Sequence, residues 1–310
     1  MEYRKLGQTG LLVSLLGFGT SPLGDVFRKV DPSETTRAVH LAIDKGINFF
    51  DTSPYYGLTL AEARLGEALL GRRTGVIVAT KCGRYGFDHF DFSAKRIVAS
   101  VDESLKRLRT DYVDILQAHD VEFGDLDQIV NETIPAMRRI QESGKARFIG
   151  ISGYPLKSLL RVAQNTLVDT ILSYCRYNLM NTEMDNALTQ FARNHGIGLI
   201  NASGLQMGLL TDEGAPPWHP APAEIRDAAV TIARICRDRG AEISSVALRF
   251  CLDHPYVSTT LVGMASRSEV QSNLRLLRLQ TNSALIEEIR SAIEGSLNYS
   301  WPSGRPENRD

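Results

Sequence analysis

Short apolar segments alternate with longer amphipathic segments along almost the whole chain. Eight of the short segments are rich in β-branched residues, and several of them are apolar at successive positions. This pattern is typical of strands that are buried on both faces. We therefore predict eight strands, at Leu15–Thr20, Asn48–Ser53, Val76–Lys81, Val113–His119, Arg147–Ser152, Thr170–Tyr174, Gly198–Ser203 and Thr259–Met264.

The segments between these strands carry helix signals. At the start of one segment, Asp31 offers an N-cap, Pro32 suits the first helical position, and Glu34 is placed as a capping-box acid. Gly46 is suited to end the same helix. A second segment is predicted to bury one apolar stripe, formed by Ile97, Val98, Val101, Leu105 and Leu108.

Eight strand–helix units in one chain predict an α/β fold, a closed parallel (β/α)₈ barrel. An open, doubly wound sheet is the alternative, but it favours a GxGxxG loop after the first strand, and none follows here. Two pieces lie outside the eightfold pattern. Residues 2–14 predict a β-hairpin that turns at Gln8-Thr9-Gly10, and the chain after Gln280 predicts one more helix and a tail containing Trp301-Pro302-Ser303-Gly304. Because no linker interrupts the chain, residues 1–310 are predicted to form a single domain.

The composition is that of a globular protein, with 310 residues of which 43% are hydrophobic and 23% charged. The formal net charge of -1 argues against a nucleic-acid or membrane-surface partner. No apolar run is long enough to span a bilayer, and the first residues lack the apolar core of a signal peptide, so a cytoplasmic location is expected. The four cysteines form no CxxC motif and are expected to be reduced and structural: Cys82, Cys175, Cys236 and Cys251.

Chemistry-bearing side chains follow three successive predicted strands. In a (β/α)₈ barrel, functional residues lie at the C-terminal ends of the strands, so these side chains are expected to meet at one mouth. The second strand ends in the stretch Asp51–Gly57, which contains Tyr56, the third ends at Lys81, and the fourth ends at His119. Each of them could be an ordinary polar residue at a strand end, but the four together favour a catalytic site.

Each member of this set has a role in proton transfer. The phenol of Tyr56 has an ordinary pKa of about 10, which makes it a poor base at neutral pH. A buried ammonium group on Lys81 would lower that pKa by stabilising the phenolate, whereas burial alone would raise it. Asp51 would keep Lys81 charged, and His119 would hydrogen-bond the substrate oxygen. The set suits chemistry at a carbinol or carbonyl, with a cofactor carrying the hydride.

The sequence resembles the aldo-keto reductase family over nearly its whole length. No single motif is decisive, but several occur together in the right order. They are Gly17-Phe18-Gly19-Thr20, the stretch from Asp51 to Gly57, Lys81, Ser104-Leu105-Lys106-Arg107-Leu108, Asp111-Tyr112-Val113-Asp114, His119, Gly144–Ser152 and Gly208-Leu209-Leu210-Thr211.

Within that family, the chain resembles a sugar-oxidising subgroup, the plant-type enzymes that act on L-galactose. The stretches that carry this resemblance are Ile47–Gly57, Ala79–Tyr85, Leu126–Pro135, Pro216–Pro220 and Trp301–Gly304. The resemblance implies oxidation of a small-molecule aldose at C1 to the lactone, with NAD as the acceptor and Tyr56 as the general base. L-Fucose and D-arabinose share the relevant stereochemistry, so the preferred sugar stays open, as does the oligomeric state.

The resemblance also implies where the cofactor binds. Family members that use NADP carry Lys-Ser near the last strand and an Arg five residues after that Ser, whereas this chain has Gly263, Met264 and Glu269. A carboxylate repels a 2′-phosphate and accepts a hydrogen bond from a free ribose hydroxyl, which favours NAD. The residues expected to bind the cofactor are Gly19, Thr20, Ser152, Tyr174, Ser203, Leu205, Gly208, Gly263, Met264, Ala265, Glu269 and Asn273.

Three observations compete with this interpretation of the cofactor site. Ser266-Arg267-Ser268-Glu269 is also a capping box, which would give Glu269 a structural role. Arg267 could reach a 2′-phosphate and so favour NADP. In addition, the family's usual Ser-Asn pair that holds the carboxamide is Ser152-Gly153 here, its usual Gln is Tyr174, and its nicotinamide-stacking aromatic aligns with Ala202.

The residues expected to contact the sugar lie at strand ends and in one aromatic loop. They are Tyr55, Arg84, Asp120, Trp218 and His219. A surface loop packed by its own aromatic is the alternative for Trp218 and His219, and no zinc-type spacing surrounds His219, so no metal is expected.

Two other functions compete with an NAD-dependent aldose dehydrogenase. The first is an NADPH-dependent carbonyl reductase of the same family, against which the replaced Lys-Ser and Arg argue. The second is a nucleotide-binding barrel that serves as a regulatory subunit, against which the intact catalytic set argues.

Overall fold

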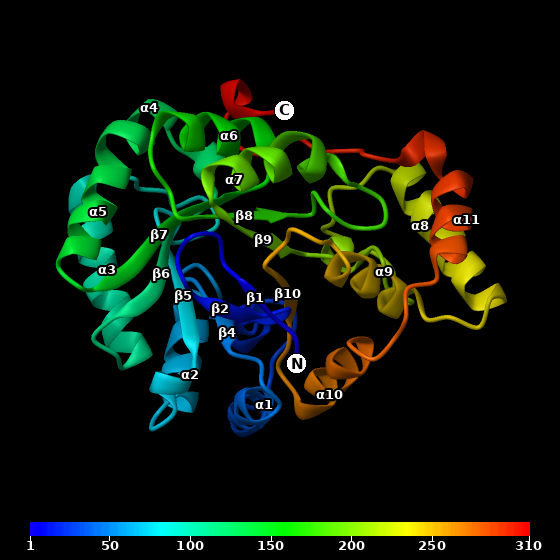
Figure 1. Cartoon of the computed structure of the whole chain (residues 1–310), viewed down its shortest axis with the longest axis horizontal. Helices are drawn as coiled ribbons and strands as arrows, with labels where there is room; N and C mark the ends of the chain where they lie inside the picture. Colours follow the sequence, from blue (N-terminus) through cyan, green and yellow to red (C-terminus); the bar gives the residue numbers. More distant parts are fainter.

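Eight parallel strands close into a barrel in the computed structural model, which describes all residues 1–310. The strands follow the order β10-β3-β4-β5-β6-β7-β8-β9, so consecutive strands are neighbours and the last pairs with the first (Figure 1). The predicted barrel and its eight strands are confirmed to within two residues at each end. The strands are β3 Leu16–Gly19, β4 Phe49–Asp51, β5 Ile77–Cys82, β6 Val113–Ala118, β7 Ala146–Gly153, β8 Thr170–Tyr174, β9 Gly198–Ala202 and β10 Thr259–Gly263.

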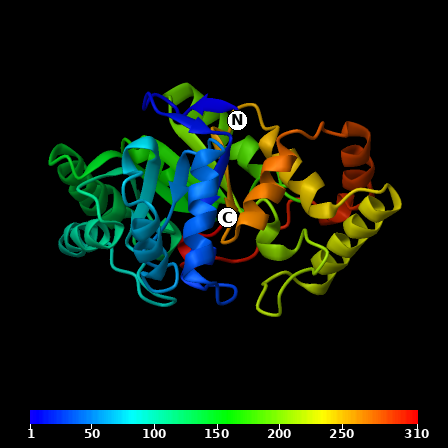
Figure 2. The ribbon, with the colours of Figure 1, turned by 90° about the horizontal axis from the view of Figure 1, so that it is seen from below.

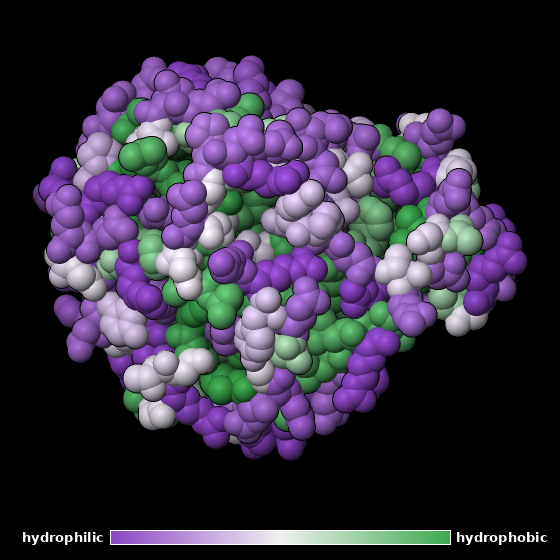
Figure 3. Space-filling model, viewed as in Figure 1, coloured by the Kyte–Doolittle hydropathy of each residue, from purple (hydrophilic) through white to green (hydrophobic).

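Helices surround this barrel. They are α1 Pro32–Asp44, α2 Leu60–Ala68, α3 Ala94–Leu108, α4 Leu126–Gln128, α5 Ile134–Glu142, α6 Leu156–Asn165, α7 Gln190–His195, α8 Ala223–Asp238, α9 Ile243–Leu252, α10 Arg267–Leu276 and α11 Ser283–Ala292. Short 3₁₀ or π turns lie at η1 Ser21–Gly24, η2 Arg73–Gly75, η3 Val121–Phe123, η4 Ile129–Thr133, η5 Asp185–Thr189, η6 Gln206–Gly208, η7 Glu294–Ser296 and η8 Pro306–Asn308. None of the helices is long and apolar enough to cross a membrane. Figure 3 shows a mainly hydrophilic surface over α5, α6 and α7.

Two local predictions about the helices need correction. The side chain of Val98 on α3 is 42% exposed, because the buried stripe follows Ile97, Val101, Leu105 and Leu108 and leaves Val98 on the flank. At the start of α1, Asp31 caps the helix as expected, accepting a hydrogen bond from the Ser33 amide at 2.9 Å. Glu34 does not complete a capping box, since its carboxylate binds Arg267 on α10 instead.

The predicted N-terminal hairpin is present and closes one end of the barrel. Strand β1, Tyr3–Lys5, pairs antiparallel with β2, Leu12–Ser14. Leu6, Leu11 and Val13 are buried against the lowest interior residues of the barrel strands, so the hairpin acts as an apolar plug. Figure 2 shows the hairpin at one end of the molecule, next to the N-terminus.

The C-terminal helix α11 is also as predicted, but the chain contains another helix outside the eightfold pattern. Helix α8 precedes α9, and Figure 1 shows α8 and α11 together on one flank of the barrel. Ile225 and Ile232 of α8, Ile243 of α9, and Leu285 and Ile289 of α11 share a second apolar core. This core attaches both extra helices to the barrel. All four cysteines are free and buried.

The interior of the barrel changes from apolar to polar along the strand direction. Alternate residues of each strand point inward, and the layer next to the hairpin contains Phe49, Ile77 and Ile115. Two positions further along the same strands stand Asp51 on β4 and Gln117 on β6, and Lys81 stands two positions beyond Ala79 on β5. The strand pattern therefore brings a group of polar side chains to the C-terminal end of an otherwise apolar core.

Candidate active site

A buried ion pair lies at the centre of the polar layer. The ammonium nitrogen of Lys81 donates to Asp51 and, at 2.8 Å, to the Thr52 carbonyl oxygen. The amide of Gln117 donates to the other Asp51 oxygen at 3.2 Å. Lys81 and Asp51 are only 1% and 2% exposed, so the pair is desolvated and depends on these contacts for its stability.

The surroundings of Lys81 keep it charged. Burial by itself would lower the pKa of Lys81, but the Asp51 carboxylate and the Tyr56 phenol outweigh it and raise that pKa above its ordinary value. The ammonium nitrogen lies 4.8 Å from the centre of the Tyr56 ring. Lys81 is thus a fixed cation beside the phenol, as the sequence indicated.

The pKa of the Tyr56 phenol is higher than its ordinary value. Burial raises its pKa to about 12, and Asp51 and Asp120 add to this effect, while Lys81 acts in the opposite direction. Lys81 therefore lowers the pKa of Tyr56, as predicted, but in the free protein burial outweighs this effect. The reason is that desolvation of the phenolate exceeds the attraction of one cation whose charge is already shared with Asp51.

His119 completes the set at the end of β6. Its ring meets the Tyr56 ring edge-on at 5.8 Å between centres. Its Nδ1 lies 3.0 Å from the hydroxyl oxygen of Ser53, and its Nε2 lies 3.6 Å from an Asp120 oxygen. Burial, together with the cations Lys81 and Arg84, lowers the pKa of His119 well below its ordinary value, so the ring is neutral.

Three of the predicted substrate residues form one cluster at the rim of this group. The Arg84 guanidinium pairs with Asp120 at 2.5 Å and stacks over the Tyr55 ring at 3.8 Å. Asp120 is 3% exposed and adopts a left-handed backbone conformation, with φ of 52°, that turns the chain at the end of β6. The cluster places a charged hydrogen-bonding pair and an aromatic face next to His119.

The order of these residues around the barrel matches a known family. The family model for the aldo/keto reductase family matches residues 15–294. The chain is an aldo-keto reductase. It is 47% identical to L-galactose dehydrogenase of Arabidopsis thaliana, over 99% of both chains. It is 30% identical to D-arabinose 1-dehydrogenase of Saccharomyces cerevisiae, over 86% of this chain and 87% of the relative.

A solved aldo-keto reductase has the same fold over its whole length. The aldo-keto reductase AKR11C1 from Bacillus halodurans, in its holo form, superimposes with a TM-score of 0.80 at 27% identity and covers 100% of each chain. The barrel described above is therefore an oxidoreductase scaffold of a family that uses a nicotinamide cofactor.

The strand ends of this aldo-keto reductase fit such a cofactor. Three buried side-chain oxygens near the predicted catalytic set have no hydrogen-bond partner, namely Thr20 Oγ1, Thr52 Oγ1 and Gln117 Oε1. Unpaired buried polar atoms are rare in folded proteins and point to a ligand or solvent partner. Gly19 ends β3 beside Gly263 of β10, and the amide of the next residue, Thr20, donates to the Asp51 carbonyl oxygen at 3.0 Å. The predicted cofactor residues at this side are thus adjacent to the Asp51–Lys81 pair.

At the start of α10, Glu269 has the structural role of a capping residue. A complete capping box is present: Ser266 accepts from the Glu269 amide, and Glu269 accepts from the Ser266 amide at 2.9 Å and the Ala265 amide at 2.7 Å. The other Glu269 oxygen pairs with Arg28 at 2.6 Å. Met264 and Ala265 are buried, and Asn273 is half-buried on the same helix.

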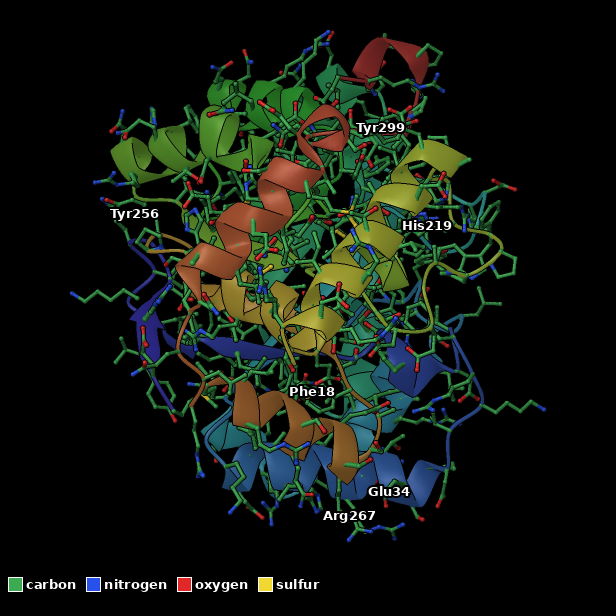
Figure 4. The ribbon with its side chains drawn as sticks, turned by 90° about the vertical axis from the view of Figure 1, so that its right-hand side faces the viewer. Phe18, Glu34, His219, Tyr256, Arg267 and Tyr299 are labelled. Atoms are coloured by element: carbon green, nitrogen blue, oxygen red, sulfur yellow. The ribbon has the colours of Figure 1, made fainter.

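Arg267 is engaged by an acidic partner from another helix. Its side chain forms two hydrogen bonds of 3.1 Å to the two Glu34 oxygens, and its amide donates to Glu34 at 2.9 Å. Hydrogen bonds from Arg267 hold the pKa of Glu34 at about 2. Figure 4 shows Glu34 and Arg267 beside each other, where α1 meets α10. Sequence reasoning missed this pairing because the partners are 233 residues apart.

The residues that depart from the family pattern lie together at the ends of β7, β8 and β9. Ser152 is buried and accepts from the Asp120 amide at 3.3 Å. Tyr174 is the register partner of Ala202, so its ring lies beside the position where the family has its stacking aromatic. A second tyrosine, Tyr154, packs 5.5 Å from Tyr174 and stacks on Trp301 at 4.8 Å. Sequence reasoning missed Tyr154, although it follows Ser152-Gly153 directly.

The loop after β9 bends through several left-handed residues. Ser203 and Gly208 have φ angles of 57° and 98°, and Leu205 lies half-buried between them. In the segment that follows, the Trp218 side chain is 58% exposed. Both ring nitrogens of His219 bind backbone: one lies 2.9 Å from Gln206 O, and the other accepts from the Ala221 amide at 3.0 Å. These contacts give His219 a structural role, in which its ring holds the loop together.

The C-terminal tail is fastened over the ends of β6 and β7 through Glu122. The Glu122 carbonyl accepts from Arg305 and Asn308, and its Oε1 accepts from Ser303 at 3.1 Å. Glu122 is fully buried, and burial together with the nearby Asp120 raises its pKa to about 8. The tail residue Trp301 is 8% exposed, so the tail covers the aromatic group beside the site. Sequence reasoning missed Glu122, whose partners come from a distant segment.

Proposed function

We propose that this protein oxidises an aldose at C1 to the lactone with NAD, and that L-galactose is the preferred sugar. The observation that carries the proposal is the buried Asp51–Lys81 pair set against Tyr56 and His119 at the mouth of the barrel. The 47% identity to L-galactose dehydrogenase of Arabidopsis thaliana and the 30% identity to D-arabinose 1-dehydrogenase of Saccharomyces cerevisiae support the choice of an aldose.

Each catalytic residue has a defined task in this reaction. The phenolate of Tyr56 would take the proton of the C1 hydroxyl as the C1 hydrogen leaves with its electron pair, so that C1 becomes a carbonyl carbon. Bound NAD would supply the hydride acceptor and the positive charge of its nicotinamide ring. Lys81 would stabilise the phenolate, Asp51 would hold Lys81 in place, and His119 would donate a hydrogen bond to the C1 oxygen.

The rim cluster suits a polyhydroxylated substrate. Arg84 offers several donors and Asp120 offers acceptors, and both are held in place by their mutual ion pair and by Tyr55. Fixed polar groups of this kind discriminate between sugar epimers, because a misplaced hydroxyl leaves one of them unpaired. We assign Tyr55, Arg84 and Asp120 to the sugar and regard Trp218 and His219 as loop residues.

The preference for NAD rests on the charges around the start of α10. Arg267, the cation nearest in sequence to the expected phosphate position, is bound to Glu34, and Arg28 is bound to Glu269, so both of these cations are already engaged. A 2′-phosphate dianion would have to displace Glu34 to gain Arg267, whereas a ribose hydroxyl needs no cation. This arrangement argues against the NADPH-dependent carbonyl reductase.

Replacing Glu34 with glutamine is expected to improve the use of NADP. The change removes the charge that neutralises Arg267, and a freed guanidinium gains a charge-assisted hydrogen bond to the phosphate, so the Kd for NADP should fall roughly 5- to 10-fold at low salt. Fluorescence titration with NADP and NAD measures this ratio. Glu103→Gln, which breaks the comparable surface pair with Arg96, is the matched control. An unchanged Kd for NADP would contradict the role of Arg267 in the choice between NAD and NADP.

The proposed activity is tested by following NADH formation from L-galactose and NAD at mildly alkaline pH. We expect turnover with L-galactose, and weaker turnover with L-fucose and D-arabinose. The methyl glycoside of L-galactose is the matched control, since it has no free C1 hydroxyl and should give no NADH. Absence of turnover with L-galactose, from folded protein that binds NAD, would contradict the proposed substrate.

A further inference from the structure

The hydroxyl group of Ser53 is a buried polar contact of the catalytic histidine that the mechanism above does not use. Ser53 lies two residues after the end of β4 and is fully buried. Its oxygen lies 3.0 Å from His119 Nδ1. The Tyr55 amide also donates to this oxygen, at 3.1 Å. These are the only two hydrogen bonds that the Ser53 side chain makes.

These two contacts determine which atom carries which proton. A serine hydroxyl has one proton to donate and two lone pairs. The Tyr55 amide occupies one lone pair, so the hydroxyl proton is free, and the only acceptor within reach is His119 Nδ1. If Nδ1 carried a proton instead, both groups would be donors, and the buried serine proton would have no acceptor.

The other side of the ring leads to the same assignment. His119 Nε2 faces an Asp120 oxygen at 3.6 Å, a distance at which an N–H is attracted and a bare nitrogen is repelled. Lys81 and Arg84 are the cations near the ring, and they oppose a second proton on it. The ring therefore has one proton, and both neighbours place that proton on Nε2.

We propose that Ser53 is a positioning residue that holds His119 as the Nε2–H tautomer. The inference rests on the proposed oxidation of a carbinol at this site. With the proton on Nε2, His119 donates to the C1 oxygen and leaves the hydroxyl proton of the sugar to Tyr56. With the proton on Nδ1, a bare Nε2 would accept that same hydroxyl proton in a hydrogen bond and compete with Tyr56 for it.

The tautomer is measured directly by nitrogen NMR of the full-length protein with ¹⁵N-labelled histidine. The chain has 6 histidines, and His119→Gln assigns the signal of interest. We expect a pyrrole-type shift at Nε2 and a pyridine-type shift at Nδ1 of His119. The opposite pattern overturns the proposal, and neither result depends on which sugar the enzyme oxidises.

Ser53→Ala tests the consequence for catalysis. Without the serine proton only Asp120 favours the Nε2–H tautomer, so the Nδ1–H tautomer should become detectable, kcat should fall by roughly 10- to 100-fold and KM for the sugar should change by much less. Ser53→Thr keeps the hydroxyl and should restore the wild-type tautomer and most of kcat. Ser100→Ala is the matched control, because it removes the hydroxyl of a different buried serine, which lies on α3. A lower melting temperature with wild-type kcat and an unchanged His119 tautomer in Ser53→Ala overturns the proposal.

Discussion

Replacing Tyr56 with phenylalanine is expected to lower kcat for aldose oxidation by about 10³-fold, within the range measured for loss of a general base. The ring stays in place between Lys81 and His119, so the fold and the Kd for NAD should be unchanged. Only the oxygen that receives the C1 hydroxyl proton is lost. Initial rates of NADH formation and a fluorescence titration with NAD separate the two effects.

The matched control for this variant is Tyr256→Phe. Tyr256 is 47% exposed and packs on Arg193, remote from the mouth of the barrel (Figure 4). It should have wild-type kcat. Because burial raises the pKa of Tyr56 to about 12, the wild-type rate should also increase with pH over the neutral to alkaline range, as the phenolate fraction grows. A Tyr56→Phe variant that kept more than a tenth of the wild-type kcat, roughly, would contradict the assignment of Tyr56 as the base.

Replacing Lys81 with methionine is expected to affect both catalysis and stability. Without the ammonium group the phenolate has no nearby cation, and kcat should fall by roughly 10²- to 10⁴-fold. Asp51 becomes a buried carboxylate without its partner, which should lower the free energy of unfolding by about 3–5 kcal/mol. Urea unfolding monitored by circular dichroism measures the second effect.

The double variant Lys81→Met with Asp51→Asn distinguishes the two losses. Removing the unpaired carboxylate should recover most of the lost stability, because no buried charge remains, but it should not recover activity. If the double variant were as unstable as the sum of the two single variants, the buried pair would not be the interaction that the structure indicates.

The eight strands could be predicted because burial on both faces leaves a local signature. Each strand is a short apolar run, and Asp51, Lys81 and His119 stand at or next to the C-terminal ends of three of them. The sequence therefore predicts both the barrel and the order of these three residues around it. The position of α8 outside the eightfold pattern could not be predicted, because its amphipathic sequence resembles that of a barrel helix.

Two similar capping patterns show where local sequence fails. Asp31-x-x-Glu34 and Ser266-x-x-Glu269 both suggest a capping box, but only the second forms one. Glu34 on α1 instead accepts hydrogen bonds from Arg267 on α10. No local sequence pattern predicts this contact, because the two residues are far apart in the chain. The contacts of Ser53 and Glu122, and the balance of burial against charge that sets the pKa of Tyr56, depend on the folded chain in the same way.

In the proposed reaction the hydride leaves C1 of the aldose. The most direct measurement uses L-galactose with deuterium at C1 and unlabelled NAD, followed by mass spectrometry of the nucleotide and the sugar product. We predict that the reduced nucleotide carries the deuterium and that the sugar product is the unlabelled lactone. Unlabelled NADH, with the deuterium retained in the sugar product, would contradict oxidation at C1.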